Sequence, residues 1–264
     1  MHIIWEEISD LDRSIRDEVE LSEDIDVGAN GDEVRRVQEW LTLHGYGLAI
    51  DGDFGPVTGS VLLQFQTDNE LEVTGIVNDE TFNLLVAPLI EVLTPIDYCP
   101  PTFAETVLIY AERHLLHHPL EIGGQNRGPW VRLYMNGHEG KKYPWCAGFV
   151  TFVIKQAADT LGMDLPIAGS FSCDVLAAQG EEGDLFVSED DIADEVENGD
   201  MPVASIFLVR KTDDDWTHTG LVTSFDEESF TTIEGNTNDD GDREGYEVCV
   251  RTRAYKKKDF IALR

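Results

Sequence analysis

The feature that most constrains the fold is a cysteine directly in front of an apolar helical stretch. Cys146 is followed by residues 147–155, whose apolar side chains recur at helical spacing, and Pro144 and Gly162 suit the two ends of a helix. The unpaired N–H groups and positive dipole end of a helix stabilise a thiolate, and a cysteine placed there has its pKa lowered from about 8.5 to ~3.5–7.5. The sequence therefore predicts a helix with a reactive thiol, Cys146, at its N-terminus.

Two predicted strands downstream carry a base and polar partners for it. His218 stands at the start of residues 219–225, and Glu234 and Asn236 follow residues 230–233, with an acidic turn between the two strands. If the strands pair as an antiparallel hairpin, His218 lies opposite Glu234 or Asn236. A thiol on a helix, with an imidazole and a polar group on a sheet, is the arrangement of papain-like enzymes.

Three blocks of this sequence, taken together, resemble the CHAP domains, the cysteine- and histidine-dependent amidohydrolases/peptidases. The blocks are residues 144–150, 217–222 and 233–237, and residues 121–128 are similar to the segment that precedes the nucleophile in many members. The resemblance covers roughly residues 103–264 and implies a papain-like fold, with helices packed on an antiparallel sheet.

The resemblance also implies a site and a reaction. Cys146 would be the nucleophile, His218 the general base, and Glu234 with Asn236 the orienting groups. CHAP domains cleave either the muramoyl–alanine amide or a link within the stem or cross-bridge peptide, and this chemistry needs no metal or organic cofactor. The candidate substrate-binding residues are Asn126, Trp145 and Trp216.

The other three cysteines are predicted to be structural residues. Cys249 lies within a strand pattern, Cys99 precedes two prolines, and the pattern around Cys173 suggests no histidine partner. None of them combines a helix start with a base, so Cys146 is the candidate nucleophile.

Two patterns resemble metal-binding motifs without matching them, and no metal site is predicted. His114 and His118 have the i, i+4 spacing of a zinc pair, but Leu115 occupies the place of the glutamate in an HExxH motif. An exposed helix end near Pro119 is the preferred interpretation. Residues 238–242 lack the spaced ligands and distal glutamate of an EF loop, so an acidic hairpin loop is expected, with calcium as the alternative.

The N-terminal part shows a separate pattern of three short helices. Val34, Val37 and Leu41 recur at helical spacing, residues 51–56 form a turn cluster, and two further helices follow. The apolar faces of these two helices are predicted to hold Val57, Val61, Leu62 and Phe65, and then Phe82 and Leu85. Residues 28–88 resemble the three-helix peptidoglycan-binding domain found beside many wall hydrolases.

Both resemblances point independently to peptidoglycan, and together they predict an α+β protein. A small three-helix bundle would precede the papain-like domain, a pairing that resembles endolysins and other cell-wall hydrolases. The predicted boundaries are residues 1–27 for an acidic N-terminal segment, 28–88 for the peptidoglycan-binding domain, 89–102 for the linker and 103–264 for the CHAP-like catalytic domain.

Composition and charge limit the partners and the place of synthesis. The chain has 264 residues with 52 acidic against 19 basic side chains, a formal net charge of −33, so nucleic acid is not expected as a partner. No apolar run is long enough to cross a membrane, and residues 181–200, without Lys or Arg, are expected to form a solvated acidic face. Residues 1–10 lack the basic start and apolar core of a secretory signal. Synthesis in the cytoplasm is therefore expected, followed by holin-assisted release or delivery by an injection apparatus.

The function predicted from these patterns is hydrolysis of peptidoglycan at the cell wall by a cysteine-dependent amidase or endopeptidase. Two alternatives lie outside catalysis: a wall-binding module with a decayed site, or a structural component of a phage tail or spike. All three catalytic positions hold competent residue types, which favours the enzyme.

Overall fold

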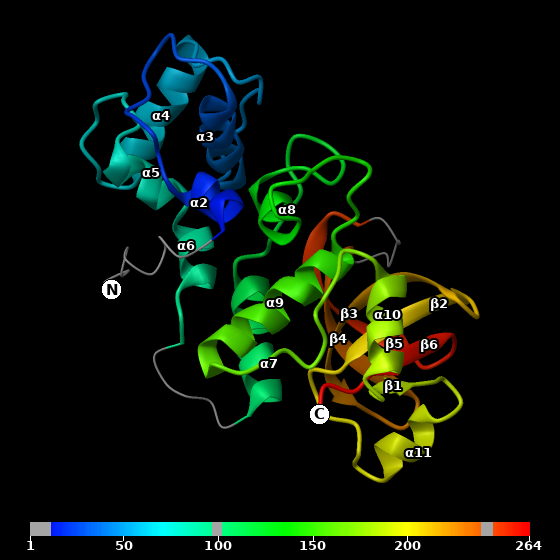
Figure 1. The fold of residues 1–264 in the computed structure, drawn as a ribbon. Coiled ribbons are helices and arrows are strands. Elements are labelled where there is room, and N and C mark those ends of the chain that lie inside the picture. Colours follow the sequence, from blue (N-terminus) through cyan, green and yellow to red (C-terminus); the bar gives the residue numbers. More distant parts are fainter. Residues whose placement is uncertain (1–11, 97–101, 239–244) are drawn as a thin grey trace. The chain divides into compact units, whose positions relative to one another are not determined.

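The chain divides into two compact units. The computed structural model describes residues 12–96, 102–238 and 245–264. The N-terminal unit contains the described residues up to Thr94 together with Leu120–Lys142, and the C-terminal unit contains Pro95–Pro119 and Tyr143–Arg264. The chain therefore passes from one unit to the other three times. Figure 1 shows the helices of the first unit and the sheet of the second.

The N-terminal unit is built from helices. They are α2 (Arg13–Val19), α3 (Asp32–Leu43), α4 (Pro56–Asp68), α5 (Asp79–Leu85), α6 (Ala87–Leu93) and α8 (Pro129–Tyr134). Helices α3, α4 and α5 are the three that the hydrophobic spacing predicts. Two antiparallel bridges, Ile25↔Val77 and Asn30↔Asp53, join the loops between them.

Two buried glutamines fix the loops that follow their helices. The side-chain oxygen of Gln38 on α3 accepts hydrogen bonds from the backbone N–H groups of residues 51 and 52, at 3.0 and 2.8 Å. The side-chain oxygen of Gln66 on α4 accepts from those of residues 74 and 75, at 3.1 and 2.9 Å. Each buried amide thus satisfies loop N–H groups that would otherwise lack a partner, and it holds the loop against its helix.

The buried faces of the three helices follow the prediction, with an exception on α4. Val57 is 67% exposed. The core-facing stripe of α4 runs instead through Thr58, Leu62 and Phe65, at positions i, i+4 and i+7, and these are buried. Val57 lies one position off this stripe, which is why it faces solvent.

The first half of the expected linker is a helix. Helix α6 has Pro88 in its first turn, where a missing N–H costs nothing, and its Leu89 and Val92 are fully buried. Proline here marks a helix start, and the apolar residues that follow it determine the structure. Residues 97–101 of the expected linker lie outside the described part of the chain.

Residues 120–142 belong to the N-terminal unit, although they fall within the range expected for the catalytic domain. Trp130 of α8 is 2% exposed and lies edge-on to Trp40 of α3, with 5.9 Å between ring centroids. Arg132 of α8 is buried among carboxylates from α2 and α3. The segment packs with this unit because both its aromatic face and its buried arginine have partners there.

The C-terminal unit is an antiparallel sheet with helices packed against it, which confirms the α+β prediction. Its described strands are β1 (Phe186–Val187), β2 (Ile206–Thr212), β3 (Asp215–Phe225), β4 (Ser229–Thr237), β5 (Glu247–Ala254) and β6 (Lys258–Ile261), in the spatial order β1-β6-β2-β3-β4-β5. Its helices are α7 (Phe103–Leu116), α9 (Cys146–Leu161), α10 (Cys173–Glu182) and α11 (Ile192–Glu197).

Helix packing on the sheet brings the first turn of α9 against the end of β4. Helix α9 packs on β3 and β4, and α10 packs on β3 (Figure 1). At Gly235 of β4 a Cβ atom would lie 2.7 Å from Trp145 and 2.8 Å from Phe149. Only glycine permits this approach, so the residue type at position 235 fixes how closely the helix start lies to the strand.

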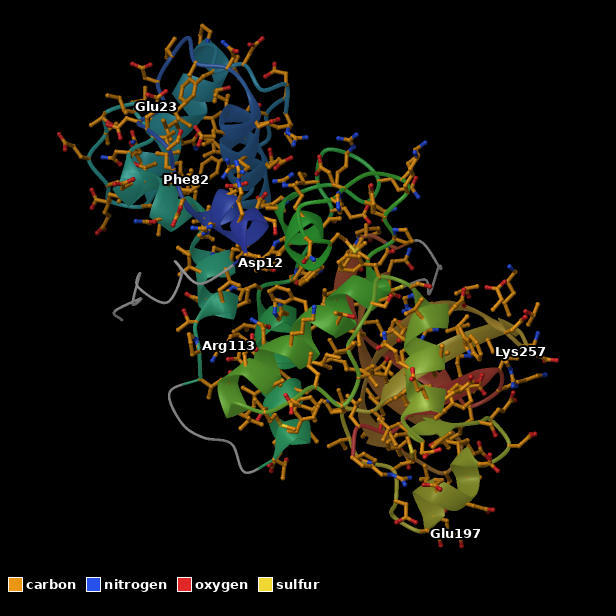
Figure 2. The ribbon with its side chains drawn as sticks, in the orientation of Figure 1. Asp12, Glu23, Phe82, Arg113, Glu197 and Lys257 are labelled. Carbon is orange, nitrogen blue, oxygen red and sulfur yellow. The ribbon has the colours of Figure 1, made fainter. Side chains whose placement is uncertain are left out.

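The acidic stretch 181–200 lies at the surface and is anchored by the pairing of β1 with β6 and by two apolar side chains. Val187 and Ile192, 7% and 1% exposed, belong to the hydrophobic core on the sheet. Glu197 at the end of α11 is exposed (Figure 2).

Candidate active site

The helix expected at Cys146 begins at that residue. Trp145 is its N-cap, and it ends at Gly162 in the left-handed conformation, with φ 61°. Pro144 precedes the N-cap and does not lie in the first turn. The N–H of Trp145 donates to Asn236 Oδ1 at 3.0 Å, which ties the helix start to β4. Cys146 therefore lies at the positive end of the helix dipole.

Strands β3 and β4 pair as the expected antiparallel hairpin, and His218 and Glu234 meet across it. His218 Nε2 lies 2.7 Å from Glu234 Oε2, and both side chains are buried, 4% and 0% exposed. The strands are longer than predicted, since β3 begins at Asp215 and β4 extends to Thr237. Both residues therefore lie within strands, where paired neighbours hold their backbone.

The Cys146 thiol is buried beside two partners. It is 5% exposed, and the Cys173 thiol and the His218 ring lie near enough to lower its pKa. The Nε2 atom of His218 bonds to Glu234, and its buried Nδ1 has no hydrogen-bond partner among the described residues. The hydrogen bond from Cys173 lowers the pKa of Cys146 most; burial opposes this, and the nearby His218 ring and the N–H of Ala147 lower the pKa further. The resulting pKa lies well below the ordinary value for a thiol, which favours the thiolate at neutral pH.

The pKa values of His218 and Glu234 are shifted in the directions that favour charges complementary to this thiolate. Burial lowers the pKa of His218, but the nearby Cys146 thiol and the hydrogen bond and charge of Glu234 outweigh it and raise the pKa to about 9. Burial raises the pKa of Glu234, but hydrogen bonds and charges from Arg253 and His218 lower it to about 2. A thiolate, an imidazolium and a carboxylate are therefore the favoured states, and they suit attack on a carbonyl carbon.

Asn236 joins backbone segments around the site. Its Oδ1 accepts from the N–H of Trp145, and its Nδ2 donates to the carbonyl oxygen of Gly245 at 2.8 Å. Its backbone is left-handed, with φ 56°, a conformation that asparagine adopts more readily than most residues. Of the two orienting candidates, Glu234 makes a direct hydrogen bond with the His218 ring, and Asn236 holds the start of α9.

Cys173 and Arg253 contact this group of residues, and the sequence patterns did not single out either of them for the site. Cys173 is the first residue of α10, and the loop before it is tied to α9. Thr151 Oγ1 donates to Ser170 O at 2.8 Å and accepts from the N–H of Ser170 at 2.9 Å. A structural role is predicted for Cys173, whereas the fold brings its thiol to Cys146 by placing the starts of two helices together.

The three substrate-binding candidates all have partners within the protein. Asn126, in the N-terminal unit, is 1% exposed, and its N–H donates to Glu121 Oε2 at 2.7 Å. Trp145 is fully buried, and the indole N–H of Trp216 donates to Asp259 Oδ2 at 2.8 Å. A role for these residues in substrate binding stays a prediction.

His114 is a core residue, contrary to the exposed helix end expected there. It is fully buried, its ring hydrogen-bonds with Gln156 Oε1 at 2.9 Å, and Phe149 lies edge-on to it. Burial lowers the pKa of His114 to about 4, so its ring is neutral. His118 is exposed and hydrogen-bonds with Glu247. Among the described residues, no three potential metal ligands come together.

Of the remaining cysteines and the acidic loop, only part lies within the described residues. Cys249 lies on β5, as predicted. Cys99 and residues 239–242, which make up most of the acidic loop considered for calcium, lie outside the described residues.

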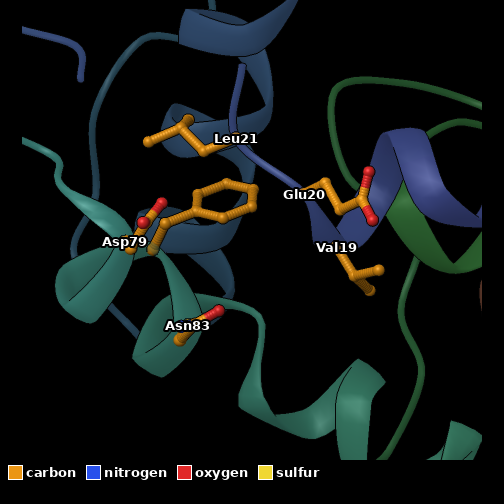
Figure 3. Close-up of a pocket in the computed structure, with 6 residues that line it drawn as sticks. Val19, Glu20, Leu21, Asp79 and Asn83 are labelled. Carbon is orange, nitrogen blue, oxygen red and sulfur yellow. The ribbon is translucent and has the colours of Figure 1, made fainter. Parts of the chain in front are cut away.

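A separate hollow of about 360 Å³ lies in the N-terminal unit (Figure 3). It is lined by Val19, Glu20, Leu21, Asp79, Phe82 and Asn83. The thiol, the imidazole and the carboxylate belong to the other unit, so this hollow is not part of the candidate active site.

Comparison with known proteins identifies one region of the chain. Residues 30–85 match the family described as "Putative peptidoglycan binding domain". Among solved structures, the SleB N-terminal domain is similar at 34% identity and a TM-score of 0.25, over 25% of this chain and 93% of that chain. A fused Zn-dependent amidase/peptidase/peptidoglycan-binding domain-containing protein from Clostridium acetobutylicum ATCC 824 is similar at 15% identity and a TM-score of 0.24. That match covers 88% of this chain and 61% of that chain. At these TM-scores, neither likeness bears on the overall fold.

No curated protein matches the chain. No helix in the described part of the chain has the length and apolar character needed to span a bilayer. The match over residues 30–85 places a peptidoglycan-binding domain in the N-terminal unit, which supports peptidoglycan as a partner and the cell wall as the place of action.

Proposed function

We propose that the chain is a peptidoglycan hydrolase that cleaves an amide or peptide bond through the Cys146 thiolate. The observation that carries the proposal is the Cys146 thiol beside the His218 ring, whose Nε2 hydrogen-bonds with Glu234 and whose buried Nδ1 has no hydrogen-bond partner in the described part of the chain. These residues share one buried centre, at the start of a helix and on a hairpin, and the pKa directions of all three favour an ionised nucleophile with a proton-bearing base.

In the proposed reaction, the Cys146 sulfur bonds to the carbonyl carbon, and the developing oxyanion accepts a hydrogen bond from the backbone N–H of Cys146. The imidazolium of His218 gives its proton to the leaving nitrogen as the C–N bond breaks, which leaves a thioester on the enzyme. Water then attacks the thioester while His218 accepts its proton, and the acid product leaves. The thiolate and the imidazolium are thereby restored.

The N-terminal domain would raise the concentration of this site at an insoluble substrate. A binding domain tethered to a catalytic domain makes the encounter with the polymer effectively intramolecular, without taking part in the chemistry. The match of residues 30–85 to a peptidoglycan-binding family supports this division of labour.

Cys146→Ala tests the nucleophile. The variant should fold normally but release fragments from purified peptidoglycan at less than about one hundredth of the parental rate, because its only covalent catalyst is gone. Cys249→Ala, which removes a thiol from β5, is the control and should stay active. Mass spectrometry of the released fragments gives the rate and identifies the bond as the muramoyl–alanine amide or a peptide link.

Two results would overturn the proposal. One is a Cys146→Ala variant with parental activity. The other is a parental protein that sediments with peptidoglycan but releases nothing, which would favour a wall-binding protein with a decayed site.

A further inference from the structure

Arg253 of β5 hydrogen-bonds with both oxygens of the Glu234 carboxylate. Its Nε hydrogen-bonds with Oε1, and its Nη2 lies 2.5 Å from Oε2. This side-on geometry is the strongest that a guanidinium and a carboxylate form, because two parallel N–H groups meet two oxygens. Glu234 is fully buried, so Arg253 neutralises a carboxylate that water does not reach.

The same two oxygens also face the other members of the site. Oε1 accepts from Thr232 Oγ1 at 2.6 Å, and Oε2 hydrogen-bonds with His218 Nε2 at 2.7 Å. With donors on both oxygens, the carboxylate has one orientation, and the oxygen bonded to His218 is also the one bonded to Arg253 Nη2. A change at Arg253 therefore acts directly on the partner of the imidazole.

Neighbouring residues hold this arrangement in place. The guanidinium carbon of Arg253 lies 5.3 Å from the centroid of the Phe207 ring, and that ring lies 6.0 Å from the His218 ring. Gly220 of β3 leaves the space that Glu234 occupies, since a Cβ atom there would lie 2.7 Å from Glu234 Cγ. The aromatic ring and the glycine together confine the arginine, the carboxylate and the imidazole to one packing.

We propose that Arg253 is a positioning residue that orients Glu234 and keeps it ionised, so that Glu234 can hold His218 as an imidazolium beside the Cys146 thiolate. This inference rests on the proposed function of the Cys146–His218 pair. Burial alone favours the neutral form of a carboxyl, and a neutral Glu234 would no longer stabilise a positive charge on His218.

The direction of the pH effect follows from these charges. Without Arg253, the pKa of Glu234 should rise from about 2, because His218 and the charge of Lys258 on β6 are then the cations left to oppose burial. As pH falls through this higher pKa, Glu234 becomes neutral, His218 loses its counter-charge and the thiolate loses the imidazolium that stabilises it. The acid limb of any property that depends on the thiolate should therefore move to higher pH.

The test compares Arg253→Met with Arg253→Lys, using Arg210→Met as the matched control. Arg210 is an arginine of the same sheet, with 29% of its side chain exposed against 18% for Arg253, and its partners are Glu189 and Asp259. Alkylation of Cys146 by iodoacetamide, followed against pH and located by mass spectrometry, reports the thiolate without any substrate. The pH dependence of kcat/KM for fragment release is the second measurement.

We expect Arg253→Met to move the acid limb of alkylation up by about one pH unit or more and to lower kcat/KM near neutral pH by about tenfold. Arg253→Lys keeps the charge but not the bidentate hydrogen bonding. Its acid limb should lie at the parental pH, while its kcat/KM should lie between those of the parent and of Arg253→Met. Arg210→Met should change neither measurement.

An unmoved acid limb in a folded Arg253→Met variant would overturn the inference, even if the rate falls, because a purely structural role lowers the rate at every pH alike. Circular dichroism establishes that the variants are folded, and Arg253→Lys still tests the inference if the methionine variant is not. A parental protein that cleaves nothing would overturn the proposed function instead, while the alkylation profile would still decide the role of Arg253.

Discussion

Each unit of this protein pairs an arginine with buried glutamates, and the two groups differ in what they connect to. In the N-terminal unit, Arg132 is 6% exposed and binds glutamates from three segments. They are Glu18, Glu39 and Glu139, with N–O distances of 2.6, 2.7 and 2.9 Å. In the C-terminal unit, Arg253, with 18% of its side chain exposed, binds Glu234, which is fully buried.

The connections at the far end distinguish their roles. Around Arg132, the bonds continue through Glu139 to Arg35 and Arg127, at 2.8 and 3.3 Å. Arg35 also pairs with Asp32 at 3.8 Å, so that network ends among charged side chains at the surface. From Arg253, the bonds continue through Glu234 to His218, and the His218 ring lies beside the Cys146 thiol. An arginine–glutamate pair thus belongs to a structural network in one unit. In our proposal, the corresponding pair in the other unit determines where a proton resides.

Arg132→Met should disrupt the arginine–glutamate network of the N-terminal unit, and it has the largest expected effect. It should lower the free energy of unfolding by about 3–5 kcal/mol, because carboxylates are left buried without their cation. Burial raises the pKa of Glu39 even with the arginine present. The loss should therefore be larger at about pH 8 than at about pH 5, where unpaired carboxyls take up protons. Urea unfolding of the full chain at both pH values measures it.

Arg13 provides the control for that experiment. It lies on α2, its side chain is 87% exposed, and its pair with Asp17 has an N–O distance of 3.8 Å. Arg13→Met should leave the free energy of unfolding unchanged within error, as exposed pairs contribute little. If the Arg132 variant were as stable as the parent, the buried cluster would not be a structural network.

The sequence predicted the parts of this protein that depend on neighbours in the chain. The helix at Cys146, the hairpin that carries His218 and Glu234, and the three helices α3, α4 and α5 all follow from local periodicity and turn residues. The match of residues 30–85 to a peptidoglycan-binding family agrees with the resemblance stated for residues 28–88. The catalytic roles of Cys146 and His218 stay predictions that only activity can test.

The parts that could not be predicted depend on long-range contacts. Arg132 finds its partners in α2 and α3, 114 and 93 residues away, so nothing near residues 120–142 indicates that they belong to the N-terminal unit. A cut before Phe103 would therefore leave residues 120–142 of the N-terminal unit attached to the C-terminal unit. Arg251 and Arg253 lie two residues apart on the same face of β5, and no local pattern marks which of them pairs with Glu234.

Glu234→Gln tests the Arg253–Glu234–His218 group of the C-terminal unit, because it removes the charge of the side chain while keeping its shape. It should lower the rate of fragment release by about tenfold or more and bring the pKa of His218 down from about 9. The alkaline limb of kcat/KM should then move to lower pH, because the imidazolium loses its proton earlier. A pH series on purified peptidoglycan measures both effects.

Asn236→Ala is the matched comparison for Glu234→Gln. Asn236 holds the N–H of Trp145, so its loss should loosen the start of α9 and reduce the rate less, with the alkaline limb unmoved. The reverse ranking, with Asn236→Ala the more damaging and Glu234→Gln nearly silent, would transfer the orienting role to Asn236.

Cys173→Ala has the smallest expected effect. It tests whether Cys173, in addition to His218, lowers the pKa of Cys146. The hydrogen bond from Cys173 is the largest cause that lowers the pKa of Cys146, so removing it should move the acid limb of Cys146 alkylation to higher pH, by less than about one unit. The rate near neutral pH should stay within about threefold of the parent, because His218 still stabilises the thiolate. Cys173→Ser keeps a hydrogen-bond donor and should return the limb toward its parental position. Identical limbs for the parent and both variants would reduce Cys173 to a packing residue, as the sequence predicts.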